Sequence, residues 1–364
     1  MDLFRPALDI LEQMGVLSQV QDKATGINRG TIFTPGAKRP VEVRIDKFVN
    51  AVSDRHVEIM RDDLSEILVA STRGEAEYIF GDSIATVSAE SGKVTFEHAG
   101  PRFFDVIVGA DGLHSNVRSL VFGDERRFSS FLGAHLAVFS LPNYLGLDRR
   151  RIAYLDVGRL AATYSARHMD DARALFLFRT ERPLVYDHHD VARQKEVLRE
   201  VFAGMDGEVI RWLDELDRTP AFYFDAITQL TMETWSRGRV TLVGDAGYCP
   251  GPVVGGSASL AVVGAYVLAG ELAAAEGDYE RAFITCEREM GEYVRGSRSL
   301  ARRAARTLIP ANRAQVWALA QSARLISHLP AGPIRGVARL SNRGLRLADS
   351  TTVKDYAGKQ RPMM

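Results

Sequence analysis

The sequence contains little cysteine and no excess of either charge. Only two cysteines, Cys249 and Cys286, occur among its 364 residues. Two widely separated cysteines make neither a disulfide framework nor a metal-binding cluster, so we expect a reducing, cytoplasmic location and no metal site. The 46 basic and 46 acidic residues give a formal net charge of zero. Bulk charge therefore indicates no particular partner.

The N-terminus lacks the basic and then apolar order of a signal peptide. It reads "MDLFRPALDILEQMG", in which Phe4, Leu8 and Leu11 recur at helical spacing. Pro6 falls in the first turn, where its missing N–H costs nothing, and Gly15 can end the helix. This spacing predicts an amphipathic helix at the start of the chain.

A long stretch lacks charge altogether, from Ala246 to Gly270. It is long enough to raise the question of a membrane span. However, the part from Gly251 to Gly270 contains five glycines and a proline and is rich in alanine and serine. A helix buried in a globular core is therefore the favoured interpretation.

Two apolar runs each end in a Gly-Asp turn, in "DVIVGADG" and "VTLVGDAG". Val106, Ile107 and Val108 form a run too continuous for a strand with one wet face, which is typical of a covered parallel sheet. Ligands of such sheets bind beyond the carboxyl ends of the strands. Glycine there lets a phosphate approach the backbone, and a carboxylate accepts hydrogen bonds from ribose. One such site alone is better explained as a plain turn, but two favour a nucleotide site.

Three segments together resemble a known family, the group A flavin-dependent aromatic hydroxylases of the para-hydroxybenzoate hydroxylase type. "DVIVGADGLHSNVR" is similar to the second dinucleotide-binding signature of that family, and "RVTLVGDAGYCPGPVVGGSASLAVVGAYVLAGEL" to its Gly-Asp signature. "MRDDLSEIL" resembles the helix whose arginine contacts the flavin nucleotide. The resemblance extends from residue 1 to about residue 300.

The resemblance implies FAD as cofactor, with Asp245 on the ribityl chain and Arg61 against the cofactor. It places Asp111 and Gly112 near the pyrophosphate and passes the flavin ring along the loop from Pro252 to Ser259. Arg118 and Asp105 would be structural and would pin the first turn. No catalytic residue is assigned. The full set of expected cofactor-binding residues is Arg61, Asp111, Gly112, Gly244, Asp245, Pro252, Gly255, Gly256 and Ser257.

The expected fold is α/β, with a Rossmann-like, three-layer FAD-binding domain interrupted by a β-rich substrate domain and followed by C-terminal helices. The FAD-binding domain would comprise residues 1–72, 99–127 and 232–310. The substrate domain would comprise 73–98 and 128–231, and a helical segment 311–364. Within these parts the patterns predict strands in 27–50 and 78–98, and helices in 60–71, 190–204 and 206–217.

Two features depart from the family pattern. The strand, Gly-x-Gly-x-x-Gly turn and helix that open other members do not occur in this sequence. We therefore expect either an upstream start or a truncated product. In the flavin loop, Ser257 stands where members commonly carry a second glycine, and Gly256 is expected to compensate.

The resemblance implies a monooxygenase that uses NAD(P)H and O2. A flavin C4a-hydroperoxide would hydroxylate an aromatic or polyketide-like small molecule. Candidate substrate-lining residues share aromatic or imidazole side chains in the strand-rich region, and each is also explained as an ordinary sheet residue. They are His135, Tyr154, Tyr164, Tyr223 and Phe224. The alternatives are another flavin oxidoreductase, such as a reductase or halogenase, and a cofactor-free remnant that only binds a ligand or partner.

Histidine and arginine raise the remaining questions. The pair His188-His189 suggests a polar surface turn rather than a metal site, and His114 is assigned no role. Eleven arginines and no acid occur between Tyr293 and Ala348. They are expected to pack against acidic parts of the same chain, or else to form a basic surface for a membrane, another subunit or a nucleic acid. Nothing resembles a nucleic-acid-binding module, so the expected partner is a small aromatic substrate, and the chain a monomer or homodimer.

Overall fold

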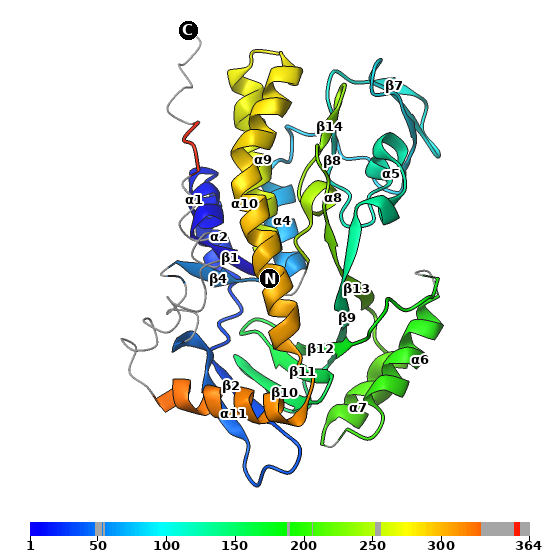
Figure 1. Cartoon of the computed structure of the whole chain (residues 1–364). Coiled ribbons are helices and arrows are strands. Elements are labelled where there is room, and N and C mark those ends of the chain that lie inside the picture. Colours follow the sequence, from blue (N-terminus) through cyan, green and yellow to red (C-terminus); the bar gives the residue numbers. More distant parts are fainter. Residues whose placement is uncertain are drawn as a thin grey trace.

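A seven-stranded sheet forms the lower part of the molecule in Figure 1. The computed structural model describes residues 1–47, 53, 55–187, 190–205, 207–251, 256–328 and 353–356. Strands β10 and β2 pair parallel, and the other pairs of this sheet are antiparallel. In spatial order the strands are β13 (Phe222–Leu230), β9 (Ser129–Pro142), β12 (Asp171–Arg179), β11 (Arg159–Ser165), β10 (Arg150–Asp156), β2 (Arg29–Phe33) and β3 (Val41–Arg44).

This sheet has two faces with different neighbours, because successive side chains of a strand alternate. The outer face is covered by helices α6 (Val191–Phe202) and α7 (Val209–Asp214), whose Trp212 packs edge-on against Phe176. On the inner face, Leu177 packs with Ile309, just beyond helix α10 (Tyr279–Leu308). The two helices expected in 190–204 and 206–217 are thus confirmed.

The two apolar runs form the parallel pair β8 (Ile107–Gly109) and β15 (Val240–Leu242), with β14 (Ser236–Arg237) beside β15. The parallel pairing agrees with the expectation. The expectation of two covered faces is wrong for β8, because Val108 is 42% exposed. The physical reason is that β8 is the edge strand of this three-stranded sheet, whereas all of β15 is buried.

Helices α9 (Gly256–Ala274) and α10 run side by side through the upper part of the molecule (Figure 1). Among the described helices, α9 is long and apolar enough to cross a membrane, by length and composition only. Here it packs against α1 and α10, and Leu260, Val263, Val267 and Leu268 are buried. This burial agrees with the interpretation of the uncharged stretch as a helix in a globular core.

The N-terminal segment forms its own small cluster with the helix before the strand-rich region. Strand β1 (Asp2–Phe4) pairs with β4 (His56–Glu58), and helices α1 (Arg5–Gln13), α2 (Leu17–Asp22) and α4 (Arg61–Ser71) pack together. The expected first helix is confirmed: Leu8 and Leu11 are buried and Gly15 has a φ of +73°. The helix predicted in 60–71 is α4.

Strand pairing differs from the expected domain boundaries in two places. Strands β2 and β3 come from the part assigned to the FAD-binding domain, yet they extend the seven-stranded sheet. Conversely, β5 (Ile84–Val87), β6 (Lys93–Phe96) and β7 (Arg102–Phe103) make a separate sheet, and Val94 packs with Ile107 and Val117. Local alternation identifies a strand but not its partner, which long-range packing decides. We therefore propose to move 29–44 to the substrate unit and 73–98 to the FAD-binding unit.

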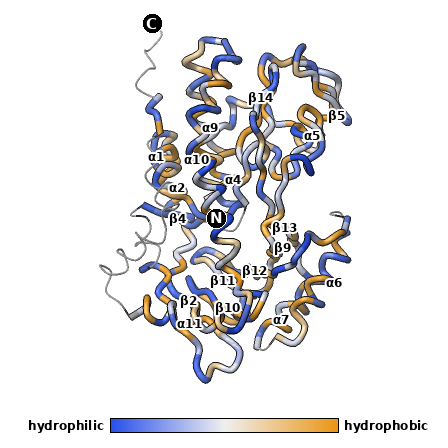
Figure 2. Tube along the Cα trace, viewed as in Figure 1, coloured by the Kyte–Doolittle hydropathy of each residue, from blue (hydrophilic) through white to orange (hydrophobic). Residues whose placement is uncertain are grey.

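The remaining helices flank these units. Helix α5 (Asn116–Phe122) follows β8, helix α8 (Asp245–Tyr248) follows β15, and α11 (Arg313–His328) crosses the foot of the molecule against β3. Figure 2 shows apolar colours along the strands and inner helices, and hydrophilic colours at the tip of the β2–β3 hairpin. The mixed α/β fold with C-terminal helices is therefore as expected.

Close packing of α8 on α9 depends on a glycine. A Cβ added at Gly264 would overlap with the buried phenol of Tyr248. We predict that Gly264→Ala lowers the free energy of unfolding by about 1–3 kcal/mol through overpacking. Adding Tyr248→Phe should restore part of this loss, because the hydroxyl is the nearest atom. Urea unfolding of both variants measures the effect, with Gly100→Ala, whose Cβ meets nothing, as the control. Equal stability of Gly264→Ala and wild type would contradict the packing argument.

Candidate functional site

The two Gly-Asp turns lie next to each other because their strands are paired parallel. Val240 is opposite Ile107 and Leu242 is opposite Gly109 in the register. The next residue, Val243, donates its N–H to the carbonyl of Gly109 at 2.9 Å. Both turns therefore leave the sheet at the same edge, where α/β sheets bind their ligands.

Arg118 joins the two turns through a guanidinium that is fully buried. Its Nη1 donates to the carbonyl of Ala246, directly after Asp245, at 2.8 Å. Its Nη2 donates to the carbonyl of Leu113 and to Oε2 of Glu125, each at 2.5 Å. The expected structural role of Arg118 agrees with this geometry.

Asp105 does not share that role. Its carboxylate is exposed and lies 3.8 Å from Nη1 of Arg239. Glu125 is instead the acid that pairs with Arg118.

Asp111 braces the first turn with both of its carboxylate oxygens. Oδ1 accepts from Oγ of Ser115 at 2.5 Å, and Oδ2 accepts from the N–H of Val117 at 3.0 Å. Ser115 in turn caps α5 by accepting from the N–H of Arg118. Gly112 has a φ of +84°, and a Cβ there would meet no atom within 4 Å. The open group at this turn is therefore the backbone of Gly112, while the contact of Asp111 with a pyrophosphate stays a prediction.

Asp245 begins α8, immediately after the left-handed Gly244 at a φ of +65°. Its Oδ1 accepts a hydrogen bond from Oγ of Ser257 at 2.5 Å. Ser257 lies in the first turn of α9, which begins at Gly256, and its hydroxyl turns back to Asp245.

Ser259 is also committed elsewhere. Its Oγ accepts the N–H of Phe4 at 3.0 Å, which attaches β1 to α9. Of the other expected loop residues, Gly256 lies at the start of α9. Pro252 and Gly255 lie outside the described residues.

Arg61 is exposed at the first position of α4. Buried Leu64 and Ile67 fix the helix beneath it. Burial raises the pKa of the Tyr223 phenol in β13, and the positive charge of Arg61 opposes this rise. The start of α4 thus lies near the inner face of the seven-stranded sheet.

The five candidate lining residues divide between the two faces of that sheet. Tyr164 is opposite Arg151, which pairs with Glu58 of β4, so Tyr164 lies on the inner face. Tyr223 is also on the inner face, since it is paired with Val138, one residue from the outer-face Phe139.

The other three candidates belong to the outer face. They pack on aromatic rings of the core there, so they are ordinary packing residues: His135 stacks on Phe178, whereas Tyr154 meets Trp212 and Phe224 meets Tyr186 edge-on. Burial lowers the pKa of His135 to about 4, which keeps its ring neutral.

A series of hydrogen-bonded side chains connects the inner face of the sheet to Arg118. Oη of Tyr223 donates to Oδ2 of Asp225 at 3.1 Å, and the same oxygen lies 2.9 Å from Nε2 of His114. Nδ1 of His114 lies 3.1 Å from Glu125, the acid that pairs with Arg118. Hydrogen bonds to Asp225 and Glu125 raise the pKa of His114 to about 10. The imidazole is therefore a cation between two carboxylates at neutral pH.

This role of His114 is absent from the sequence-based expectations. The histidine and Asp225 are 111 positions apart, and no local pattern joins them. The one sequence signal for this contact is the position of His114 in the motif "DVIVGADGLHSNVR", whose turn follows a strand and faces a neighbouring element.

The described part of the chain has neither a disulfide bond nor a metal-binding cluster at these turns. Cys249 and Cys286 are free and buried, and burial raises the pKa of both thiols. Within the described ranges no cluster of three or more His, Cys, Asp or Glu side chains is arranged to hold a metal. The pair His188-His189 lies outside the described residues.

The donor set suits a dinucleotide with a sugar chain and phosphates. Gly112 and Gly244 present left-handed backbone at the sheet edge. Asp245 supplies a carboxylate for a hydroxyl group, and Arg61 a cation from the neighbouring helix. No nucleophile–base pair is found among these residues, so the chemistry would come from a cofactor.

Comparisons with known proteins agree with this geometry. Residues 5–282 match a family model described as FAD binding domain. A flavin-dependent monooxygenase of Legionella longbeachae is 38% identical over 279 residues, which cover 76% of this chain and 71% of the relative. The uncharacterised protein MT1298 of Mycobacterium tuberculosis is 43% identical over 298 residues, covering 80% and 79%.

Solved structures give the same result for the fold. The crystal structure of tetracycline destructase Tet(51) superposes with a TM-score of 0.81 at 27% identity, covering 98% of this chain and 88% of that one. The clamped pair of Gly-Asp turns, the family match and these relatives together show that the chain belongs to the FAD-dependent aromatic hydroxylase family of flavoprotein monooxygenases.

Proposed function

We propose that this chain uses NAD(P)H and O2, with FAD bound at the two Gly-Asp turns, to hydroxylate an aromatic or polyketide-like small molecule. The observation that carries the proposal is the position of the turns. They are clamped together by Arg118, and the second turn packs on the C-terminal end of β13 through the N–H of Leu230 and the carbonyl of Cys249. The flavin would supply the redox chemistry, and the protein would orient the substrate and exclude water.

The cofactor would be held by residues of three elements. Asp245 would accept a hydroxyl of the ribityl chain, with Ser257 fixing the carboxylate. The backbone of Gly112 would lie against the pyrophosphate, since nothing else occupies the space where a side chain would be. Arg61 would contact the nucleotide from the start of α4. The N-terminus of α9, at Gly256, would face the polar edge of the ring system.

The substrate would lie between these turns and the inner face of the sheet. The hydroxyl of Tyr223 donates a hydrogen bond to Asp225, so its oxygen can accept a hydrogen bond from a phenol or enol. Partial burial and then Asp225 raise the pKa of Tyr223, which keeps the phenol protonated. Arg61 would favour an ionised, more electron-rich substrate ring.

Relatives support the polyketide-like part of the proposal. Two structures named as tetracycline destructases, Tet(51) and Tet(55), resemble the chain at 27% and 28% identity with TM-scores of 0.81 and 0.79. Tetracyclines are multi-ring molecules that carry phenol and enol groups. A substrate of that chemistry would use both the apolar sheet and the polar group of Tyr223.

The direct test measures NAD(P)H oxidation by the FAD-loaded chain with phenolic and tetracycline-type compounds, and product mass in parallel. We expect oxidation to depend on substrate and to add one oxygen atom. Asp245→Asn should weaken FAD binding by about 10-fold or more, since a charged hydrogen-bond acceptor is lost. Asp105→Asn, at an exposed carboxylate, is the matched control. Oxidation of NAD(P)H without any oxygenated product would instead indicate a reductase and overturn the proposal.

The His114 bridge predicts a pH dependence of stability. Its folded pKa of about 10 lies above the ordinary 6.5, so its stabilisation is full below pH 6.5 and is lost as the pH rises through 10. We expect the stability difference between wild type and His114→Gln to shrink steadily over this window. Urea unfolding at pH 6, 8 and 10 measures it, with His98→Gln as the control. A difference that does not change with pH would show that the bridge is absent.

A further inference from the structure

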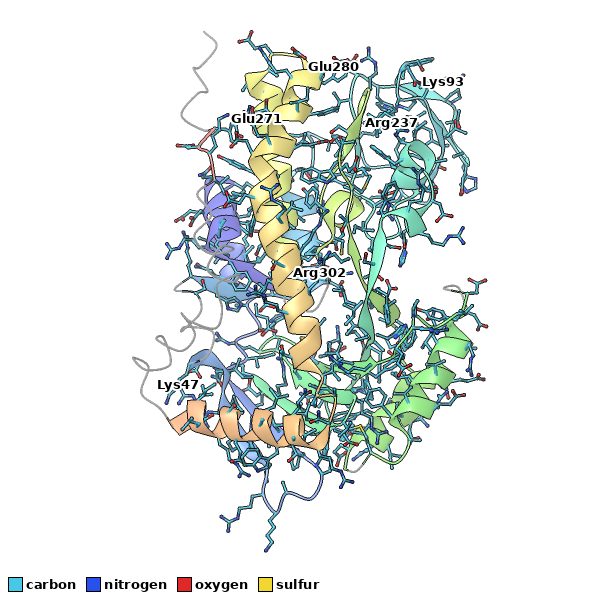
Figure 3. The ribbon with its side chains drawn as sticks, in the orientation of Figure 1. Lys47, Lys93, Arg237, Glu271, Glu280 and Arg302 are labelled. Carbon is cyan, nitrogen blue, oxygen red and sulfur yellow. The ribbon has the colours of Figure 1, made fainter. Side chains whose placement is uncertain are left out.

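One face of the lower half of α10 carries four arginines around a groove. Arg295, Arg298 and Arg302 are spaced by three and four residues and so lie on the same side of the helix, and the next residue, Arg303, lines the edge of the groove. Figure 3 labels one of them, Arg302, where α10 passes the strands. The groove has a volume of about 410 Å³, within the range of small-molecule sites. Its lining consists of Thr231, Arg295, Arg298, Ser299, Arg302 and Arg303.

These guanidinium groups lack counterions within the part of the chain that the structure describes. None of the four forms an ion pair with a carboxylate there. Nε and Nη2 of Arg298 are buried and have no hydrogen-bond partner. Burial, and then the charge of Arg302, lower the pKa of Arg298 to about 10. Among the described residues, the expected packing of the arginine-rich segment against acids of its own chain is thus not found for this part of α10.

A buried glutamine holds the groove in shape and connects it to the flavin turn. Gln229, at the end of β13, is fully buried. Its Nε2 donates to the carbonyls of Pro250 and Arg298, at 2.9 and 3.0 Å. Its Oε1 accepts from Nε of Arg302 at 2.6 Å. The remaining nitrogens of Arg302 are thus placed before anything binds, which lowers the cost of ordering them on binding.

We propose that this groove is a binding site for a phosphate-type oxyanion. Arginine forks match the geometry of phosphate oxygens, and arginine tolerates burial better than the strongly hydrated lysine does. An anion in the groove would offset the uncompensated positive charge of Arg298, which is otherwise costly to bury. Thr231 and Ser299 add hydroxyl donors. Two sources of phosphate fit: inorganic or metabolite phosphate, and the phosphates of the nicotinamide dinucleotide, the second of which rests on the proposed function.

The site is tested with sodium pyrophosphate as the probe, by thermal unfolding of the chain at constant ionic strength. We expect Tm to rise with concentration, by roughly 1–3 °C near saturation. Arg302→Gln and Arg298→Met should abolish the rise, whereas Arg313→Gln on α11 should leave it unchanged. Arg298→Met should also keep or raise the Tm without pyrophosphate, because it removes an unpaired buried charge.

Two results would overturn the site. The first is a wild-type Tm that does not respond to pyrophosphate. The second is a response that survives in both Arg298→Met and Arg302→Gln. A fall in the Tm of Arg298→Met without pyrophosphate would indicate that Arg298 is a structural residue of the core and would also contradict the proposal.

Kinetics with the FAD-loaded enzyme then separate the two sources. If the dinucleotide uses the groove, Arg302→Gln should raise the KM for NAD(P)H about 10-fold or more with little change in kcat, and pyrophosphate should compete with NAD(P)H. An unchanged KM would overturn the dinucleotide as the source and leave a smaller phosphate compound. Pyrophosphate binding by a wild type that does not oxidise NAD(P)H at all would count against the proposed function and not against the site.

Discussion

The buried guanidinium of Arg118 is the interaction on which the arrangement of the functional residues depends. It contacts the carbonyl of Ala246 in one turn, the carbonyl of Leu113 in the other, and the carboxylate of Glu125. Main-chain pairing between β8 and β15 is short, only three residues long. A planar cation with several fixed donors therefore sets the relative position of Asp245 and Gly112 beyond the ends of those strands.

A series of side-chain contacts connects Arg118 to the seven-stranded sheet. Glu125, which pairs with Arg118, also contacts His114. His114 contacts Asp225, which accepts a hydrogen bond from Tyr223. Alternating charges thus connect the two Gly-Asp turns with the inner face of the sheet. On the other side of the second turn, the buried amide of Gln229 donates to the carbonyl of Pro250 and accepts from the guanidinium of Arg302. The two Gly-Asp turns are held from two directions, which suits the proposed reaction, because that reaction needs its cofactor and substrate in a defined position.

Turns and helices could be predicted from the sequence, but strand pairing and contacts between distant residues could not. The Gly-Asp turns follow from glycine conformation and strand ends, and the first helix follows from apolar spacing. The pairing of 29–44 with the substrate sheet and the exposure of Val108 depend on which strands come together, and alternation within one strand does not specify that. The bridge from His114 to Asp225 joins residues far apart in the sequence, and the uncompensated charge of Arg298 appears only when its neighbours are known.

The most direct measurement is the FAD dissociation constant of Arg118→Lys, from the visible flavin absorption band, with far-UV circular dichroism to check folding. Lysine keeps the charge but has one compact donor group, so it cannot contact Ala246, Leu113 and Glu125 together. The account predicts a folded protein whose FAD binding is weakened by about 10-fold or more. A folded Arg118→Lys variant that binds FAD as tightly as wild type would contradict it.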